Sequence, residues 1–144
     1  MLDAEIAASK FVPGRSLQDI DGQDWGDPDP CDSHLAQTCT RLHRKQIADF
    51  DDEDLRVMVG QGIGLTTLVP LATSVVERRP LASGDLYPGA LLAALIRLPG
   101  GYWAQHIELH VRVVAVARAI DLGDPELAGT DLAVTLRCWL EESA

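Results

Sequence analysis

The sequence is poor in cysteine, in aromatic residues and in basic residues. Its 144 residues include three cysteines, and aromatic side chains make up 5% of the chain. Cys31, Cys39 and Cys138 are odd in number and widely spaced, which argues against a disulfide framework and for free thiols in a reducing compartment. Only 12 Lys and Arg stand against 22 Asp and Glu, a formal net charge of −10. Because such a charge repels phosphate groups, we expect no binding to nucleic acid or to an anionic membrane surface.

Long hydrophobic stretches are also missing. The longest apolar run, Ala90 to Ile96, is far shorter than the roughly 20 residues that cross a bilayer. The first ten residues, MLDAEIAASK, lack the apolar core of a secretory signal, so we expect a cytoplasmic protein with no membrane partner. Residues 1–144 are predicted to form one domain, because 47% of them are apolar and a chain of this length buries about two-thirds of its extended surface.

Hydrophobic spacing predicts an all-α protein, a compact bundle of about six helices with short loops. An acidic N-terminal loop is predicted at residues 19–32, DIDGQDWGDPDPCD, because proline and aspartate disfavour helix interiors; Trp25 is its one apolar anchor. Residues 1–15 predict a modest helix or a frayed arm. The predicted helices of the bundle lie near residues 34–45, 52–60, 67–79, 88–98, 102–121 and 126–141.

Polar residues and glycines mark several helix ends. Asp51 is placed to cap the helix that follows it, by accepting a first-turn N–H group. Thr66 or Thr67 is predicted to cap the next one, which would put Pro70 where a missing amide hydrogen costs little. The run GQGIG at residues 60–64 separates these two helices and predicts a turn with positive φ.

The C-terminal third contains the clearest helix and the most ambiguous segment. The clearest helix extends from about Tyr102 to Asp121, with an inner stripe of Trp103, Ile107, Val111, Val114 and Ala117. In residues 126–141, Leu132 and Leu136 are spaced as on a helix, but alternation through Val134 also fits a strand. The length of the segment and its helical neighbours favour a helix.

Three patterns that suggest a cofactor or a metal are each incomplete. The GQGIG run lacks the third glycine of a dinucleotide fingerprint and follows a predicted helix. The Asp-rich loop would place Gln23 and Trp25 where a calcium loop requires carboxylates. His106 and His110 lie one helical turn apart, but HIELH is not the zincin order and no C-x-x-C pair occurs. We therefore predict no cofactor and no metal.

Two rival functions can be drawn from side chains alone. Cys39 and His43, one helical turn apart, would be the reactive pair of a small cysteine- and histidine-dependent hydrolase. No third orienting group and no nucleophile-elbow motif accompanies them, so we predict no enzyme activity. Alternatively, Trp103, Trp139 and the apolar helices would form the face of a non-catalytic homo-oligomeric module. The sequence leaves the oligomeric state open.

A series of short segments occurs in an order that resembles a known protein family. The segments are WGDP at 25–28, SHL at 33–35, TC at 38–39, RLHRK at 41–45, EDLR at 53–56, GQGIGL at 60–65, LVPLA at 68–72 and PLASGDLYPG at 80–89. They cover about residues 17–98 and resemble the immunity proteins of bacterial contact-dependent growth inhibition systems. Ala90 stands where the family pattern suggests an acidic residue, so we expect this helix start to be more buried here.

The resemblance implies a cytoplasmic protein that binds the C-terminal toxin domain of a cognate surface effector and blocks it without catalysis. Many such toxins are nucleases with basic substrate clefts, which an acidic surface would complement. The first candidates for toxin contact are the loop aspartates Asp21, Asp24, Asp27, Asp29 and Asp32. Further candidates are Asp51, Asp52, Glu53, Gln61, Asp85 and Tyr87.

Overall fold

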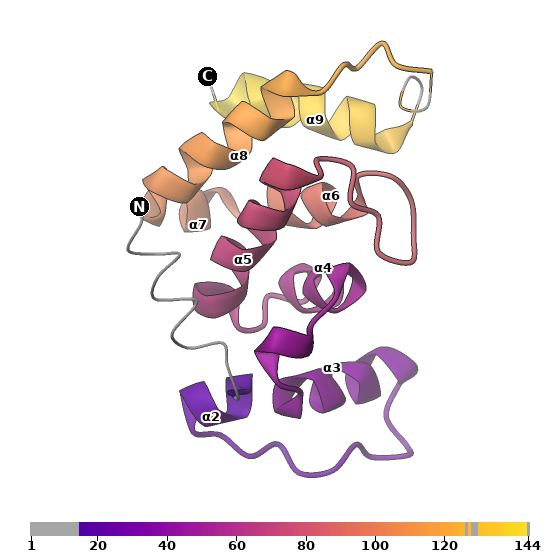
Figure 1. Cartoon of the computed structure of the whole chain (residues 1–144), viewed down its shortest axis with the longest axis vertical. Coiled ribbons are helices and arrows are strands. Elements are labelled where there is room, and N and C mark those ends of the chain that lie inside the picture. The colour runs from indigo at the N-terminus through magenta and orange to yellow at the C-terminus, as the bar shows by residue number, and fades with distance from the viewer. Residues whose placement is uncertain (1–14, 126, 128–129, 144) are drawn as a thin grey trace.

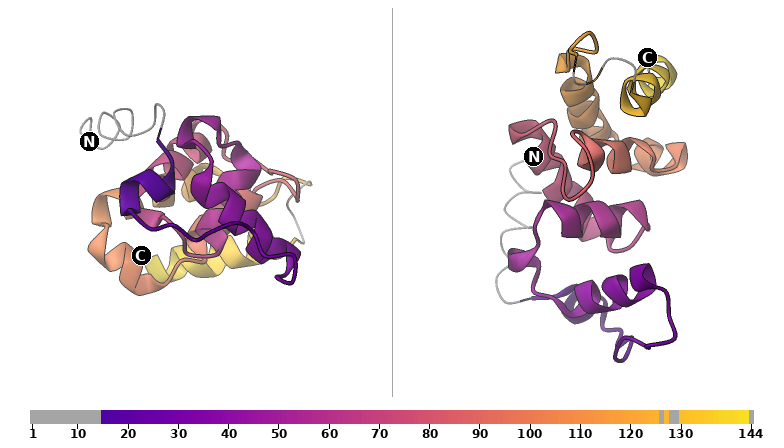
Figure 2. Two further views of the ribbon diagram at one scale, coloured as in Figure 1. Left: turned by 90° about the horizontal axis from the view of Figure 1, so that it is seen from below. Right: turned by 90° about the vertical axis from the view of Figure 1, so that its right-hand side faces the viewer.

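The computed structural model describes residues 15–125, 127 and 130–143, which form an all-α fold without strands (Figure 1). The helices follow one another along the long axis of the molecule, and Figure 2 shows from a second side that α2 and α3 form one end. Among the described residues, no helix has the length and the apolar content to cross a membrane. The elements are α2 (Leu17–Asp21), α3 (His34–Arg44), the 3-10 turn η1 (Ile47–Asp49), α4 (Asp52–Gly60), α5 (Leu65–Arg78), α6 (Ala90–Ile96), α7 (Gly100–Gln105), α8 (Ile107–Ala119) and α9 (Asp131–Ser143).

Helix α6 lies at the centre of the core, as its apolar sequence predicts. All of its residues from Ala90 to Ile96 are buried, and α4, α5 and α9 pack around it. Ala90 is among them, as expected from its departure from the family pattern. The helix begins at Gly89, which has φ +87° and leaves no space for a side chain, because an added Cβ would overlap Leu132 Cδ2 of α9. Glycine therefore allows α6 to approach α9 closely.

Helix α4 begins and ends as its sequence predicts. The Asp51 carboxylate accepts the Asp54 N–H at 2.8 Å, and the Asp54 carboxylate accepts the Asp51 N–H at 3.2 Å, which completes a capping box. Its predicted inner residues Leu55, Met58 and Val59 are buried. The turn after α4 has positive φ at Gly62 and Gly64, as the glycine run predicts.

One predicted helix start and one predicted loop boundary are wrong. Helix α5 begins at Leu65 directly after Gly64, which has φ +65° and caps the helix without a side chain. Neither threonine is therefore the cap, and Pro70 lies inside the helix beyond the first turn, where it has no N–H to donate to the preceding turn. Residues 19–21 of the predicted acidic loop belong instead to α2, because Ser16 and Asp19 form a capping box around its first turn.

The predicted helix from Tyr102 to Asp121 is two helices. The chain leaves the helical conformation at His106, which has φ −133° and ψ 56°, and α8 begins in a new direction. As a result Ile107 and Val111 are 65% and 62% exposed, although the sequence places them on the inner stripe. The core face of α8 is formed by Val113, Val116 and Ala117.

The end of the chain is helical rather than extended. Helix α9 buries Leu132 and Leu136 against the core and leaves Val134 exposed. The helical spacing of the leucines is therefore confirmed, and the alternation through Val134 does not indicate a strand. The helix or arm expected at residues 1–15 lies, apart from Arg15, outside the described residues.

Candidate functional site

The acidic loop, defined here as residues 22–33, connects α2 to α3 at the end of the molecule remote from α9 (Figure 1). Three aspartates shape it locally, because each of them accepts a backbone N–H two residues further on. Asp21 Oδ1 accepts the Gln23 N–H at 2.8 Å, Asp24 Oδ1 that of Gly26 at 2.8 Å, and Asp29 Oδ1 that of Cys31 at 2.9 Å. These Asx turns give the loop a defined course without regular secondary structure.

Helix α3 holds the loop through Arg44, whose guanidinium contacts two aspartates. Nη1 donates to Asp27 Oδ1 at 2.8 Å and Nη2 to Asp24 Oδ1 at 3.2 Å. The hydrogen bonds to Asp27 and then to Asp24 raise the pKa of Arg44. The pKa of Asp24 is lowered, first by the Gly26 N–H and then by Arg44. The paired carboxylates nevertheless stay accessible, since the side chains of Asp24 and Asp27 are 68% and 91% exposed.

His43 is the second anchor between α3 and the loop. It is fully buried, and its Nε2 lies 2.8 Å from Asp21 Oδ2, a contact that lowers the pKa of Asp21. The Trp25 indole stacks on the imidazole at a centroid distance of 3.9 Å with only 4° between the ring planes. Trp25 is therefore the apolar anchor that the sequence predicts, and its partner is the histidine that was considered for catalysis.

The remaining aspartates of the loop carry charge that no cation balances. In the part of the chain that the structure describes, Asp29 and Asp32 take part in no ion pair, and both are exposed. Six aspartates lie between residues 19 and 32, whereas Arg44 contributes a single positive charge. This end of the molecule is therefore acidic, and hydrogen bonds hold the carboxylates of Asp24, Asp27 and Asp29 in place.

The acidic start of α4 has a structural use. Asp51 caps the helix, and Asp52 forms a fork-shaped ion pair with Arg79 at 2.5 and 3.0 Å, which connects α4 to the end of α5. These two predicted contact residues therefore stabilise the fold. Carboxylates at this end of a helix are also favoured by the helix dipole.

Glu53 connects α4 to the loop that precedes α6. Its carboxylate contacts Arg56 Nε at 2.7 Å and Nη2 at 2.5 Å, and it accepts the Asp85 N–H at 3.0 Å. The hydrogen bonds from Arg56 are the main reason why the pKa of Glu53 is lowered. Gly84, with φ +58°, allows the close approach, because an added Cβ would lie 2.6 Å from Glu53 Oε1 and 3.0 Å from its Cα.

The loop held by Glu53 forms one side of a groove of about 360 Å³, which runs between the end of α4, α6 and the residues after α6. The groove brings together two predicted candidates, Gln61 and Tyr87. Leu86 and Tyr87 on its edge are 57% and 38% exposed. Sequence reasoning missed Arg97, an exposed residue that lines the groove and directly follows the apolar run of α6. A lone arginine after a wholly buried helix is the signal that could have identified it.

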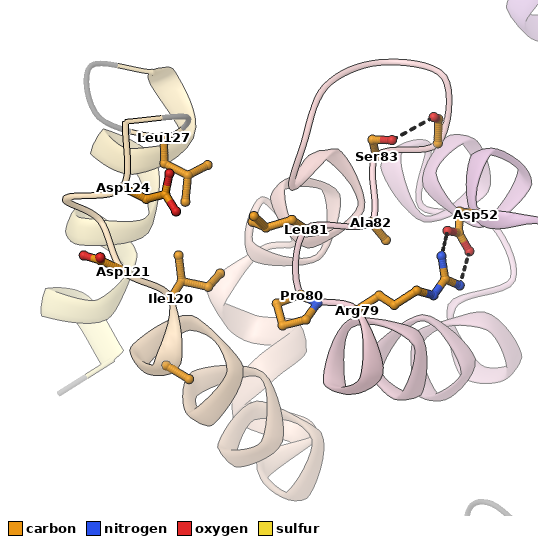
Figure 3. Close-up of a pocket in the computed structure, with 12 residues that line it drawn as sticks. Asp52, Arg79, Pro80, Leu81, Ala82, Ser83, Ile120, Asp121, Asp124 and Leu127 are labelled. Carbon is orange, nitrogen blue, oxygen red and sulfur yellow. Dashed lines mark hydrogen bonds and ion pairs between the residues drawn. The ribbon is translucent and has the colours of Figure 1, made fainter.

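A second cavity, of about 660 Å³, lies between residues 79–84 on one side and residues 119–124 with Leu127 on the other (Figure 3). The Asp52–Arg79 pair lies at one side of it, and Asp121 and Asp124 lie at the other. Sequence patterns do not single out these last two aspartates, because the two walls of the cavity are far apart along the chain.

The side chains considered for other functions have different surroundings. Burial raises the pKa of the Cys39 thiol, which disfavours the thiolate that a nucleophile needs. Trp103 and Trp139 are 3% and 8% exposed and pack on one another at a centroid distance of 6.1 Å, so they do not form an exposed face. Among the residues with a described position, no three His, Cys, Asp or Glu side chains converge to hold a metal ion.

Comparison with known proteins identifies the family. Residues 19–113, well over half of the chain, match the profile of a family described as CDI immunity proteins, where CDI is contact-dependent growth inhibition. The match includes the acidic loop and the groove, whereas α9, Asp121 and Asp124 lie beyond it. A search of the curated proteins finds no match. The chain therefore belongs to the family of CDI immunity proteins, which neutralise the toxins of contact-dependent growth inhibition.

Proposed function

We propose that this immunity protein acts in the cytoplasm by binding the toxin domain of its cognate effector through the acidic loop. The observation that carries the proposal is the attachment of the loop to α3. Arg44 holds Asp24 and Asp27. His43, on which Trp25 stacks, holds Asp21, so that little conformational entropy of this part of the loop is lost when a partner binds. The carboxylates of Asp27, Asp29 and Asp32 are exposed and can each meet a cation of the partner.

The charge of the chain supports a basic partner. A net charge of −10 attracts a basic toxin from beyond contact distance, and the attraction weakens over a Debye length of about 8 Å at physiological ionic strength. A basic cleft that binds a phosphate-containing substrate would be covered by the same fixed carboxylates. Inhibition by occupation of the cleft requires no catalytic group in the immunity protein.

The proposal is tested with neutralised loop variants. The triple variant D27N/D29N/D32N removes three charges, and the substitution at Asp29 retains a side-chain oxygen that can accept the Cys31 N–H of the Asx turn. The matched control E108Q/E141Q/E142Q removes three charges from exposed positions on α8 and α9. Each variant is co-produced in bacteria with the toxin domain encoded beside its gene, and survival and binding affinity are measured.

We expect the affinity of the loop variant for the toxin domain to be at least about tenfold lower and its protection of the cell to be poor. Electrostatic complementarity at a contact surface speeds association and sets the relative position of the two partners. The control is expected to bind and protect as the wild type does. Equal affinity and equal protection by the two triple variants would show that the acidic loop is not the contact surface.

A further inference from the structure

The groove beside α4 differs in its charged side chains from the acidic loop. Arg56 and Arg97 both line it, and none of the described residues that line it is Asp or Glu. Acidic residues outnumber basic ones 22 to 12 in this chain, so a concave surface whose only charged lining residues are arginines is unusual for it. The acidic loop and this groove therefore call for partner surfaces of different charge.

The two arginines differ in whether an acidic side chain of this protein already pairs with them. The Arg56 guanidinium is held by Glu53, and its side chain is 23% exposed. Arg97 is exposed, and in the described part of the chain it takes part in no ion pair. Its guanidinium can therefore accept a carboxylate with two parallel hydrogen bonds, without displacing a partner of its own.

Apolar surface lies next to this charge. Leu86 and Tyr87 are exposed at the edge of the groove, and the buried small side chains of Ala90 and Ala94 form part of its wall. At about 360 Å³ the space is at the small end of the roughly 300–1,000 Å³ of ligand pockets. It suits one or two side chains better than a whole metabolite.

We propose that this groove receives an acidic segment of the same toxin domain, an Asp or Glu next to an apolar residue. The carboxylate pairs with Arg97, and the apolar side chain packs against Leu86 and Tyr87. This inference rests on the proposed function and adds to it a second contact of opposite sign. Two contacts of opposite sign would select the cognate toxin, because a toxin with a cation at the second position is repelled there.

The wall of the groove is held in place before any partner arrives. Glu53 accepts the Asp85 N–H, and Gly84 packs against the start of α4, so the residues that lead into Leu86 and Tyr87 are held against that helix. A partner that binds here has little loop entropy to remove, which favours affinity.

The test measures the affinity of the full-length protein for the purified toxin domain encoded beside its gene. We expect R97A to bind about tenfold more weakly and R97E more weakly still, since a buried bidentate pair at an interface is among its strong contacts. The control R137E makes the same charge change at an exposed position of α9 that does not line the groove, and it should bind as the wild type does. Thermal unfolding of each variant verifies that the fold is intact.

A charge exchange tests the chemistry of the occupant. Each exposed Asp or Glu of the toxin domain is changed to Arg in turn, and we expect one such variant to restore binding to R97E. Wild-type affinity of R97E would overturn the inference, and so would weakened binding that no toxin variant restores. If R97E binds normally while D27N/D29N/D32N does not, the groove proposal fails and the function proposed for the acidic loop stands. If the loop variant binds normally and R97E does not, the contact proposed for the acidic loop fails and the groove stands as the contact with the toxin domain.

Discussion

Replacement of Glu53 by alanine should destabilise the protein by an amount that follows from its contacts. The change removes the ion pair with Arg56 within α4 and leaves the Asp85 N–H without its acceptor. A hydrogen bond to a charged group contributes about 1.5–3 kcal/mol, and an ion pair within one helix about 0.3–0.5 kcal/mol. Because the Glu53 side chain is only 22% exposed, we expect E53A to lower the free energy of unfolding by about 2–3 kcal/mol. For a domain of this size that corresponds to a fall in Tm of about 4–10 °C.

The loss should be concentrated in the loop before α6. Urea denaturation gives the global change, and amide hydrogen exchange gives the local one, with faster exchange expected at Asp85. The conservative variant E53Q keeps an oxygen that can accept the Asp85 N–H, so it should lose less stability and less protection than E53A. If E53A unfolds at the wild-type urea concentration and Asp85 exchanges at the wild-type rate, Glu53 does not hold the loop.

Three further predictions follow from single contacts. G89A should cost about 2–4 kcal/mol in urea denaturation, because positive φ and overlap with α9 oppose a side chain, whereas G100A, where a Cβ meets nothing, should be nearly neutral. Arg112 lowers the pKa of Glu77 in the folded state, so at acidic pH the unfolded state binds more protons than the folded state. The stabilisation from this pair is complete above the ordinary pKa of Glu and is lost as the pH falls through the lowered pKa. The free energy of unfolding of E77Q should therefore fall less on acidification than that of the wild type. Iodoacetamide should modify the buried Cys39 only when the protein unfolds, which mass spectrometry of native and urea-treated samples would detect; rapid native labelling would contradict its burial.

Helices whose signals are local could be predicted from the sequence. Helix α6 is an apolar run that only a core centre can bury, and α4 carries both halves of its capping box within four residues. The predicted start of α5 was wrong because Gly64 caps the helix through its backbone conformation alone. Thr66 and Thr67 are common capping residues, so the sequence pattern favoured them instead.

The break between α7 and α8 could not be predicted from periodicity. Ile107 and Val111 have the spacing of a buried stripe, and yet the change of direction at His106 leaves them exposed. The packing of α8 on α5 decides which of its faces is buried, and one ion pair that crosses this contact, Arg112 with Glu77, spans 35 residues. Tertiary packing determines such a pair, and the spacing of residues within one helix cannot predict it.

The candidate surfaces were predicted in composition but not in arrangement. The acidic residues could be counted, whereas the cations that hold Asp24, Asp27 and Asp52 lie 17 to 27 residues away along the chain. The sequence could therefore not show which carboxylates already have a partner. Arg97 was missed for the same reason, because its groove exists only when α4 and α6 pack together.

The central claim is that fixed negative charge on the acidic loop brings the toxin domain to this protein. Stopped-flow measurement of the association rate constant over a range of ionic strengths tests it most directly. We predict a rate that falls steeply as salt increases for the wild type, and a clearly shallower dependence for D27N/D29N/D32N than for E108Q/E141Q/E142Q. An association rate that salt does not change, or the same salt dependence in both triple variants, would contradict the claim.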